Sequence, residues 1–376
     1  MTPTPLRRAL FAVTERFAYL NHAAAGVLAL PVRDALKDFI DAHAAGGIMR
    51  TFPYEARMPE YRRRIASFIG ARESQIAILR NTSDGANAIA AGLDWNEGDE
   101  IVLPDNEFPA NVQPWRTLQR YGVVLRFVRT AKHRLTPDVL REHLSSRTKL
   151  VALSWISFAD GYRHDLSALA EVAHARSVPI VVDAIQGLGA FPLDVRSSGV
   201  DGVYCGGAKW MLALQGVGFL YLEDRLMDRL RVAMPGWRSM RDMWNFLAYE
   251  QPFSANASRF EGGTPNFIGA LSLAGSIALL EEADPTRIAK HVLELTDRLC
   301  EGLRSAGAQI VSERGSDRSS GVVLFRLPDR DSVALGKALQ SAGIVTTYRH
   351  NGVRVSPHGY NTEEEIDAVI DAVSGF

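Results

Sequence analysis

Short apolar runs alternate with amphipathic stretches between residues 75 and 222. The runs have the length of strands and are bounded by polar, glycine or proline positions, which is typical of buried β-strands. Predicted strands cover residues 75–79, 100–104, 149–157, 178–184, 200–206 and 216–222. Between two of them, residues 166–177 carry apolar side chains at helical spacing. Continuous apolar strands separated by helices predict an α/β fold with a mainly parallel sheet covered on both faces.

The pattern changes after residue 265 to long helical stretches, a strand over 321–328 and strand-like sequence over 344–357. A final helix opens with a capping box formed by Thr362 and Glu365. We therefore predict a large α/β domain over residues 15–265 and a smaller C-terminal α+β domain over residues 266–376. Residues 1–14 are expected to pack against the smaller domain, and residues 234–258 to form an excursion over the surface or the active site.

Composition narrows the possible functions. The chain has 376 residues, 47% of them hydrophobic, and a net charge of -1, so it lacks the basic footprint of a protein that binds nucleic acid or an anionic membrane. It contains only Cys205 and Cys300, which indicates neither a disulfide framework nor a cysteine metal site. His22 and His350 have no neighbouring ligands in sequence, so no metal site is predicted. No signal-peptide core or membrane-spanning run is present, and we expect a cytoplasmic protein.

Polar residues stand where several predicted strands end. Asp183 closes an apolar run, and Lys209 follows another. Thr82 and Ser83 lie between a strand and a helix, where hydroxyls and free N–H groups form an anion site as readily as a simple helix cap. In open α/β sheets, ligands bind in the crevice at the carboxyl ends of the strands. Together these features indicate a cofactor with a phosphate, a basic ring nitrogen and a carbonyl, such as pyridoxal 5′-phosphate (PLP).

Seven motifs then carry a resemblance to a known family. In chain order they read YLNHAAAG, RNTSDGAN, DNEFPANVQPW, VDAIQG, GGAKW, EGGTPNF and VRVSPHGYNTEEEID. These segments resemble, in the same order, those of the class V aminotransferase family of fold-type I PLP-dependent enzymes. That family includes cysteine desulfurases, selenocysteine lyases, kynureninase and isopenicillin-N-epimerase-like proteins.

The resemblance implies roles for the residues that bind the cofactor. Lys209 would form the Schiff base with PLP, and Asp183 and Gln186 would meet the ring nitrogen and the phenolic oxygen. Thr82 and Ser83 would contact the phosphate.

The resemblance also implies a homodimer with shared active sites, because Thr264 would reach the phosphate of the neighbouring subunit. Arg354 would hold the substrate carboxylate. Arg349 and Ala24 are expected on the same substrate side.

Several positions depart from the family pattern. Phe108 stands where relatives have a histidine stacked on the ring; it could cover the ring, or be plain core, but cannot transfer a proton. Gly206 and Ala208 replace a serine and a histidine, and Phe158 replaces an asparagine. No cysteine lies between Arg349 and Arg354, so persulfide chemistry of the desulfurase kind is not expected.

The sequence thus predicts a PLP-dependent enzyme acting on an amino acid or small amine, most like an aminotransferase. Epimerisation and β- or γ-elimination remain open, because the same cofactor serves all three. A PLP-fold protein that binds a ligand without turnover is a further alternative: the departures at positions 108, 158, 206 and 208 keep it open, whereas the intact set of Lys209, Asp183, Gln186 and Arg354 argues against it.

Overall fold

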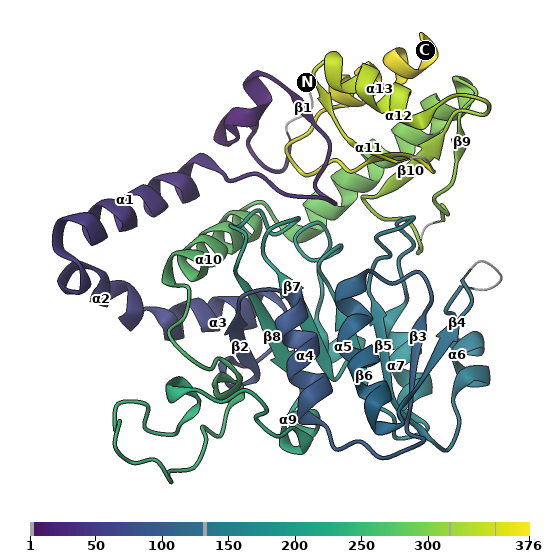
Figure 1. The fold of residues 1–376 in the computed structure, drawn as a ribbon. Coiled ribbons are helices and arrows are strands. Elements are labelled where there is room, and N and C mark those ends of the chain that lie inside the picture. Colours follow the sequence, from purple (N-terminus) through teal and green to yellow (C-terminus); the bar gives the residue numbers. More distant parts are fainter. Residues whose placement is uncertain (1–3, 131–133, 316, 350) are drawn as a thin grey trace.

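A computed structural model describes residues 4–130, 134–315, 317–349 and 351–376. Its centre is a seven-stranded sheet with the strand order β2-β8-β7-β6-β5-β3-β4 (Figure 1). The strands are β2 (Ile76–Leu79), β3 (Glu100–Pro104), β4 (Val124–Val128), β5 (Thr148–Ser154), β6 (Ile180–Asp183), β7 (Gly202–Gly206) and β8 (Gly218–Leu222). Among these strands, β8 runs opposite to the other six: it pairs antiparallel with β2 and β7, and the remaining pairs are parallel. The predicted α/β fold with a mainly parallel sheet is confirmed.

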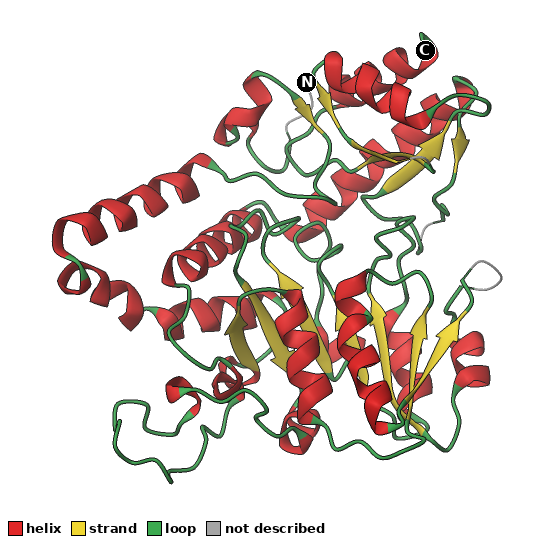
Figure 2. Cartoon of the chain, viewed as in Figure 1, coloured by secondary structure: helices red, strands yellow, loops and turns green. Residues whose placement is uncertain are grey.

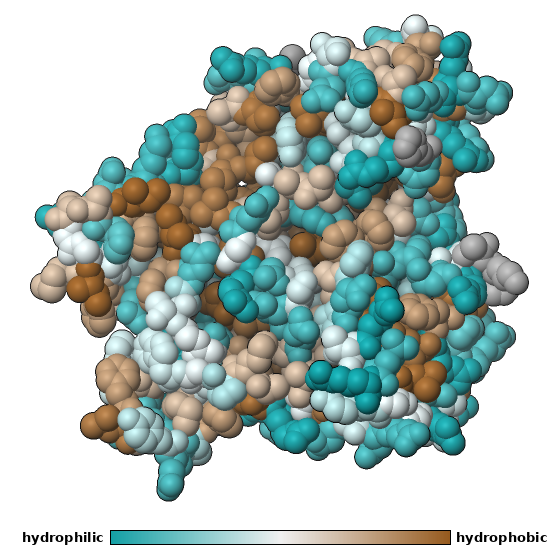
Figure 3. Space-filling view, in the orientation of Figure 1, coloured by the Kyte–Doolittle hydropathy of each residue, from teal (hydrophilic) through white to brown (hydrophobic). Residues whose placement is uncertain are grey.

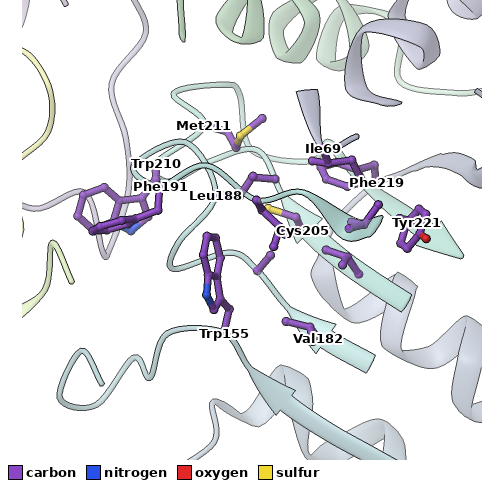
Figure 4. Close-up of a cluster of buried hydrophobic side chains, with 14 of the residues drawn as sticks. Ile69, Trp155, Val182, Leu188, Phe191, Cys205, Trp210, Met211, Phe219 and Tyr221 are labelled. Carbon is purple, nitrogen blue, oxygen red and sulfur yellow. The ribbon is translucent and has the colours of Figure 1, made fainter. Parts of the chain in front are cut away.

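Helices cover both faces of this sheet, which explains the continuous apolar runs of its central strands (Figure 2). On one face, Leu150 and Val181 pack with Ile89 of helix α4 (Thr82–Gly92). On the other face, Val151 and Val182 pack with side chains of α3 (Met58–Phe68), α7 (Leu166–His174) and α10 (Phe267–Glu282). The second cluster continues beneath the end of β7, where two buried tryptophans, Trp155 and Trp210, project into it (Figure 4).

Strand β4 was not predicted. It pairs in parallel with β3 at the edge of the sheet, and Val124 is exposed while Arg126 forms an ion pair with Glu100 at 3.1 Å. An edge strand buries fewer of its side chains than a central strand, so the sequence lacks the continuous apolar run used to recognise the others.

The C-terminal part contains a four-stranded antiparallel sheet in the order β12-β13-β10-β9. Its strands are β9 (Gln309–Ile310), β10 (Val323–Arg326), β12 (Thr347–Arg349) and β13 (Gly352–Val355), covered by helices α11 (Pro285–Ser305), α12 (Ser332–Ser341) and α13 (Glu363–Ser374). Helix α13 begins at the predicted capping box, because Glu365 N–H donates to Thr362 Oγ1 at 3.3 Å and Thr362 N–H donates to Glu365 Oε2 at 3.0 Å.

The N-terminal segment joins the two parts. Strand β1 (Ala18–Tyr19) pairs in parallel with β11 (Ile344–Val345), and Leu6 N–H donates to Gly359 O at 3.0 Å. The chain then crosses to the large part through α1 (Leu30–Gly46) and α2 (Ile48–Ala56), and α10 packs against α1 and α3 (Figure 1). The exact boundary between the two domains stays a prediction.

Shorter elements complete the described chain. They are α5 (Gln113–Arg116), α6 (Pro137–His143), α8 (Val195–Ser198), α9 (Asp224–Arg229) and seven 3-10 turns, of which Trp237–Ser239 lies in the predicted surface excursion. Across the parts of the chain described above, no helix combines the length and apolar character needed to cross a membrane.

The N-terminal segment passes close to the backbone of residue 209, and we expect this close contact to affect stability. Gly26 N–H donates to Ala208 O at 2.8 Å, and a Cβ at position 26 would lie 2.1 Å from Lys209 O. We expect Gly26→Ala to lower the free energy of unfolding by about 1–3 kcal/mol, because the backbone must move apart. Urea denaturation measures this change.

The matched control is Gly275→Ala in the middle of α10, where the nearest atom to an added Cβ lies at an ordinary 3.5 Å. Alanine favours a helix more than glycine, so this variant should be at least as stable as the unsubstituted protein. If both variants unfold at the urea concentration of the unsubstituted protein, the close crossing at Gly26 does not stabilise the fold.

Candidate active site

Three neighbouring parallel strands end at one edge of the large sheet. Strand β5 ends at Ser154, β6 at Asp183 and β7 at Gly206. In the register of these strands, Ser154 pairs with Asp183 and Asp183 with Tyr204. The segments that follow them therefore start side by side, at the carboxyl edge where open α/β sheets bind ligands.

Asp183 is the last residue of β6, so it lies at this edge of the sheet, and it is 1% exposed. Its carboxylate accepts a hydrogen bond from Ile185 N–H at 2.9 Å. Burial raises the pKa of Asp183 to about 6, although this hydrogen bond and the charge of Lys209 oppose the shift. A buried carboxylate of this kind is stabilised by a cation brought close to it.

Lys209 follows β7 and faces the same region. Burial lowers the pKa of Lys209 to about 8, an effect that the Asp183 charge opposes and the Arg354 charge reinforces. Its Nζ lies 5.6 Å from the centroid of the Phe108 ring. No ion pair joins Lys209 to Asp183 within the described chain. The amine is therefore easier to deprotonate than an ordinary lysine.

A cavity of about 400 Å³ opens above Lys209. It brings together six residues that the sequence analysis selected: Ala24, Phe108, Gln186, Lys209, Arg349 and Arg354. These come from the N-terminal segment, three loops of the large part and two strands of the C-terminal sheet, which are far apart in sequence.

Arg354 and Arg349 give the cavity a positive side. Arg354 lies on β13 and donates from one terminal nitrogen to Phe158 O at 3.0 Å, while its buried Nε has no hydrogen-bond partner in the part of the chain that the structure describes. Burial and the charge of Arg349 lower the pKa of Arg354 to about 10. Among the described residues, neither arginine forms an ion pair with a carboxylate, so the cavity favours an anionic ligand.

The predicted phosphate residues lie at the start of helix α4. Thr82 is buried, and its Oγ1 accepts a hydrogen bond from Gly206 N–H at 3.1 Å; Ser83 follows and is half-buried. The side chain that caps the helix is Asn81, which accepts from Asp84 N–H at 2.9 Å, so the alternative of Thr82 or Ser83 as the cap is wrong. The cap at Asn81 leaves the Thr82 hydroxyl proton available for a ligand.

Thr264 is not brought to this cavity. It is exposed and lines a different hollow, together with Arg80 and Asp84. The single chain therefore assembles every selected residue around the Lys209 edge except this threonine.

The loop between β3 and α5 forms the aromatic side of the cavity. Phe108 is 44% exposed and meets Phe158 edge to face, with ring centroids 5.2 Å apart. Phe108 is thus a wall of the cavity, and the alternative that it belongs to the buried core is wrong.

Glu107 is a half-buried residue beside the site that sequence reasoning missed. Its carboxylate accepts from Ser154 N–H at 2.7 Å and from Asn111 Nδ2 at 2.9 Å. Burial raises the pKa of Glu107 to about 7, against the effect of these hydrogen bonds, and the charge of Asp183 adds to the rise. Through its hydrogen bond with Ser154, Glu107 connects the loop that carries Phe108 to the end of β5. The only signal in the sequence was its place next to Phe108 in a matched motif.

Histidines and acids do not form a metal site in the described chain, where no group of three possible ligands comes together. His22 is fully buried and makes hydrogen bonds at 2.9 Å to Ser356 O and at 2.8 Å to Tyr360 OH. His350 lies outside the described residues.

Comparisons with known proteins agree with this arrangement. An uncharacterized aminotransferase of Bacillus subtilis is 28% identical over 368 residues, which cover 98% of this chain and 96% of the relative. A solved apo structure of a cysteine desulfurase from Thermococcus onnurineus NA1 is similar with a TM-score of 0.88 at 26% identity, covering 98% of this chain and 96% of that one.

A second solved structure, in which glycine is covalently linked to the PLP cofactor, has a TM-score of 0.90 at 23% identity and covers 98% of this chain and 99% of that one. At this identity the similarity concerns the fold alone. A family model described as Aminotransferase class-V matches residues 18–369. The chain therefore belongs to the class V aminotransferase family.

Proposed function

We propose that this protein is a PLP-dependent enzyme that acts on an amino acid or a small amine, with amino-group transfer as the first expectation. PLP is the cofactor of its family. The observation that carries the proposal is that the Lys209 amine and the Arg354 guanidinium line the same cavity. This arrangement places a nucleophile beside a cation that fits a carboxylate. A cytoplasmic location remains part of the proposal.

The residues present fit PLP group by group. Lys209 offers an amine to its aldehyde, and the buried Asp183 offers a carboxylate to its ring nitrogen. Thr82 and the first turn of α4 offer hydrogen-bond donors to its phosphate. Gly206 keeps this corner open, because a Cβ there would lie 3.2 Å from Thr82 Oγ1.

When bound, PLP supplies a ring that withdraws electrons from the α-carbon of the substrate. Asp183 would keep a proton on the ring nitrogen, because its pKa of about 6 falls when a cation comes close. Lys209 would hold the cofactor covalently and would later accept and return protons. A pKa of about 8 lets it do both near neutral pH.

Arg354 would bind the substrate carboxylate. Its hydrogen bond to Phe158 O fixes the guanidinium plane, and its Nε remains to be paired. A carboxylate satisfies such a planar donor with two parallel hydrogen bonds. Ala24 and Arg349 would line the same end of the cavity.

The cysteines do not support a persulfide route. Cys205 and Cys300 are both buried, burial raises the pKa of each thiol, and neither lines the cavity of Lys209. The thiolate is the reactive form of cysteine, and both sites disfavour it. We therefore favour amino transfer over desulfuration, with epimerisation and elimination as alternatives of the same family.

We expect the PLP-loaded protein to transfer amino groups between an amino acid and a keto acid. A panel of amino acids is incubated with a keto-acid acceptor, while new amino acid, ammonia, sulfide and the opposite enantiomer are measured. Arg354→Ala should raise KM for amino acids by roughly 10- to 100-fold, since a charge-assisted hydrogen bond is lost, and leave amines without a carboxylate unaffected.

Other products would decide between the alternatives. Sulfide from cysteine without amino transfer would contradict the proposed reaction. A visible spectrum that no amino acid or amine changes would indicate a protein that binds PLP without turnover.

A dimer with shared active sites belongs to the same proposal. Thr264 lies away from the Lys209 cavity of its own chain and is exposed, so it is free to serve another chain. Exposed apolar side chains also gather on the corner between α1 and α2 and on the surface excursion (Figure 3). They are Ile48, Met49, Phe52, Trp244, Phe246 and Leu247. An apolar surface of this kind favours association.

Mixing two inactive variants tests the shared site. Lys209→Ala and Thr264→Ala proteins are combined, their subunits are allowed to exchange, and activity and PLP binding are measured. If Thr264 serves the partner, each mixed dimer has one site with both lesions and one intact site, so activity returns.

The matched control replaces Thr264→Ala by Thr82→Ala, because Thr82 contacts Gly206 of its own chain. That mixture should regain nothing beyond the activity of the Thr82 variant. Equal behaviour of the two mixtures, or a fully active monomer in ultracentrifugation, would rule out sharing through Thr264.

A further inference from the structure

The side-chain amide of Gln186 is held at both ends by the protein itself. Gln186 is 3% exposed and lies in the turn after β6. Its Nε2 donates to Ala23 O at 3.0 Å, and its Oε1 accepts from Trp210 Nε1 at 3.2 Å.

These two partners fix the orientation of the amide chemically. An indole N–H can only donate, and a backbone carbonyl can only accept. A rotated amide would place N–H against N–H at Trp210 and oxygen against oxygen at Ala23. The Gln186 amide therefore keeps one orientation, with one N–H engaged by Ala23 and a second still available. Gln186 also lines the cavity of Lys209.

Trp210 is itself immobilised. Its side chain is fully buried in the hydrophobic cluster (Figure 4). It packs near the rings of His22 and His358, at centroid distances of 5.9 and 5.7 Å. His358 accepts from Gly359 N–H at Nδ1, at 2.7 Å, so its Nε2 carries the proton donated to Trp210 O at 2.9 Å. Through this hydrogen bond, the C-terminal part stabilises the position of Trp210, the residue next to Lys209.

We propose that Trp210 is a positioning residue, whose indole N–H orients Gln186 so that the free amide N–H meets an oxygen of the bound cofactor. This inference rests on the proposed function, because it takes the cavity of Lys209 as the PLP site. With Oε1 held by the indole, Gln186 can only donate toward the cavity. Without the indole N–H, only the Ala23 carbonyl still orients the amide, so its N–H is held less firmly toward the cofactor oxygen.

The test compares PLP binding to the apoproteins by equilibrium dialysis. Trp210→Phe keeps an aromatic ring but removes the N–H. We expect its Kd for PLP to rise about tenfold, the usual range for a lost hydrogen bond at a buried site. The pH midpoint of the visible band of the bound cofactor should also rise, because a donor to its oxygen anion is lost.

The matched control is Trp155→Phe. Trp155 is 6% exposed in the same cluster and packs against the segment of Gly187 from another side, without a hydrogen bond to Gln186 (Figure 4). Its Kd and pH midpoint should stay close to those of the unsubstituted protein. Equal losses in both variants would assign the effect to general core packing and overturn the proposal.

A double-mutant cycle separates an action through Gln186 from a direct one. If Trp210 acts through Gln186, adding Trp210→Phe to a Gln186→Ala protein should leave its Kd and pH midpoint unchanged. A full tenfold loss in that background would overturn the proposal.

Two outcomes keep this inference distinct from the proposed function. Unsubstituted protein that binds no PLP would contradict the proposed function itself, whereas normal PLP binding by Trp210→Phe would overturn the inference alone. Should Trp210→Phe fail to fold, hydrogen exchange in the unsubstituted apoprotein decides. The Trp210 indole N–H should be protected before PLP is added, and free exchange of that proton would overturn the proposal.

Discussion

Two opposite charges that act on each other, the buried Asp183 and the half-buried Lys209, govern the site. Burial raises the pKa of Asp183 to about 6 and lowers the pKa of Lys209 to about 8, and no ion pair within the described chain joins them. Arg354 adds a third, half-buried charge that has no carboxylate partner among the described residues. A ligand with a basic nitrogen, an electrophilic carbon and an anionic group stabilises all three at once, and PLP with its substrate offers this combination.

The fold makes this burial possible by bringing distant segments to one sheet edge. Parallel strands place Asp183 and the segment of Lys209 side by side. The N-terminal segment packs on the loop that carries Lys209, where Gly26 N–H donates to Ala208 O. The C-terminal part contacts the same loop, where His358 donates to Trp210 O. The lysine is thereby fixed from both ends of the chain, which gives the small domain a direct part in the site.

The sequence predicted the central strands because both of their faces are buried, and it predicted the cavity residues because they lie in or beside motifs that match the family. It missed what depends on three-dimensional neighbours. Strand β4 is an edge strand with half-exposed side chains, and Glu107 becomes notable only because it accepts a hydrogen bond from the end of β5. The bond from Trp210 to Gln186 joins two motifs whose spacing along the chain carries no trace of their contact.

The central claim is that Lys209 is the covalent anchor of PLP, and peptide mapping after borohydride reduction tests it most directly. Borohydride turns a PLP–lysine linkage into a stable amine, which mass spectrometry locates in a digest. The account predicts the added mass on the peptide of Lys209, and its absence from the Lys209→Ala protein. A modification found on another lysine, or undiminished in that variant, would contradict the account.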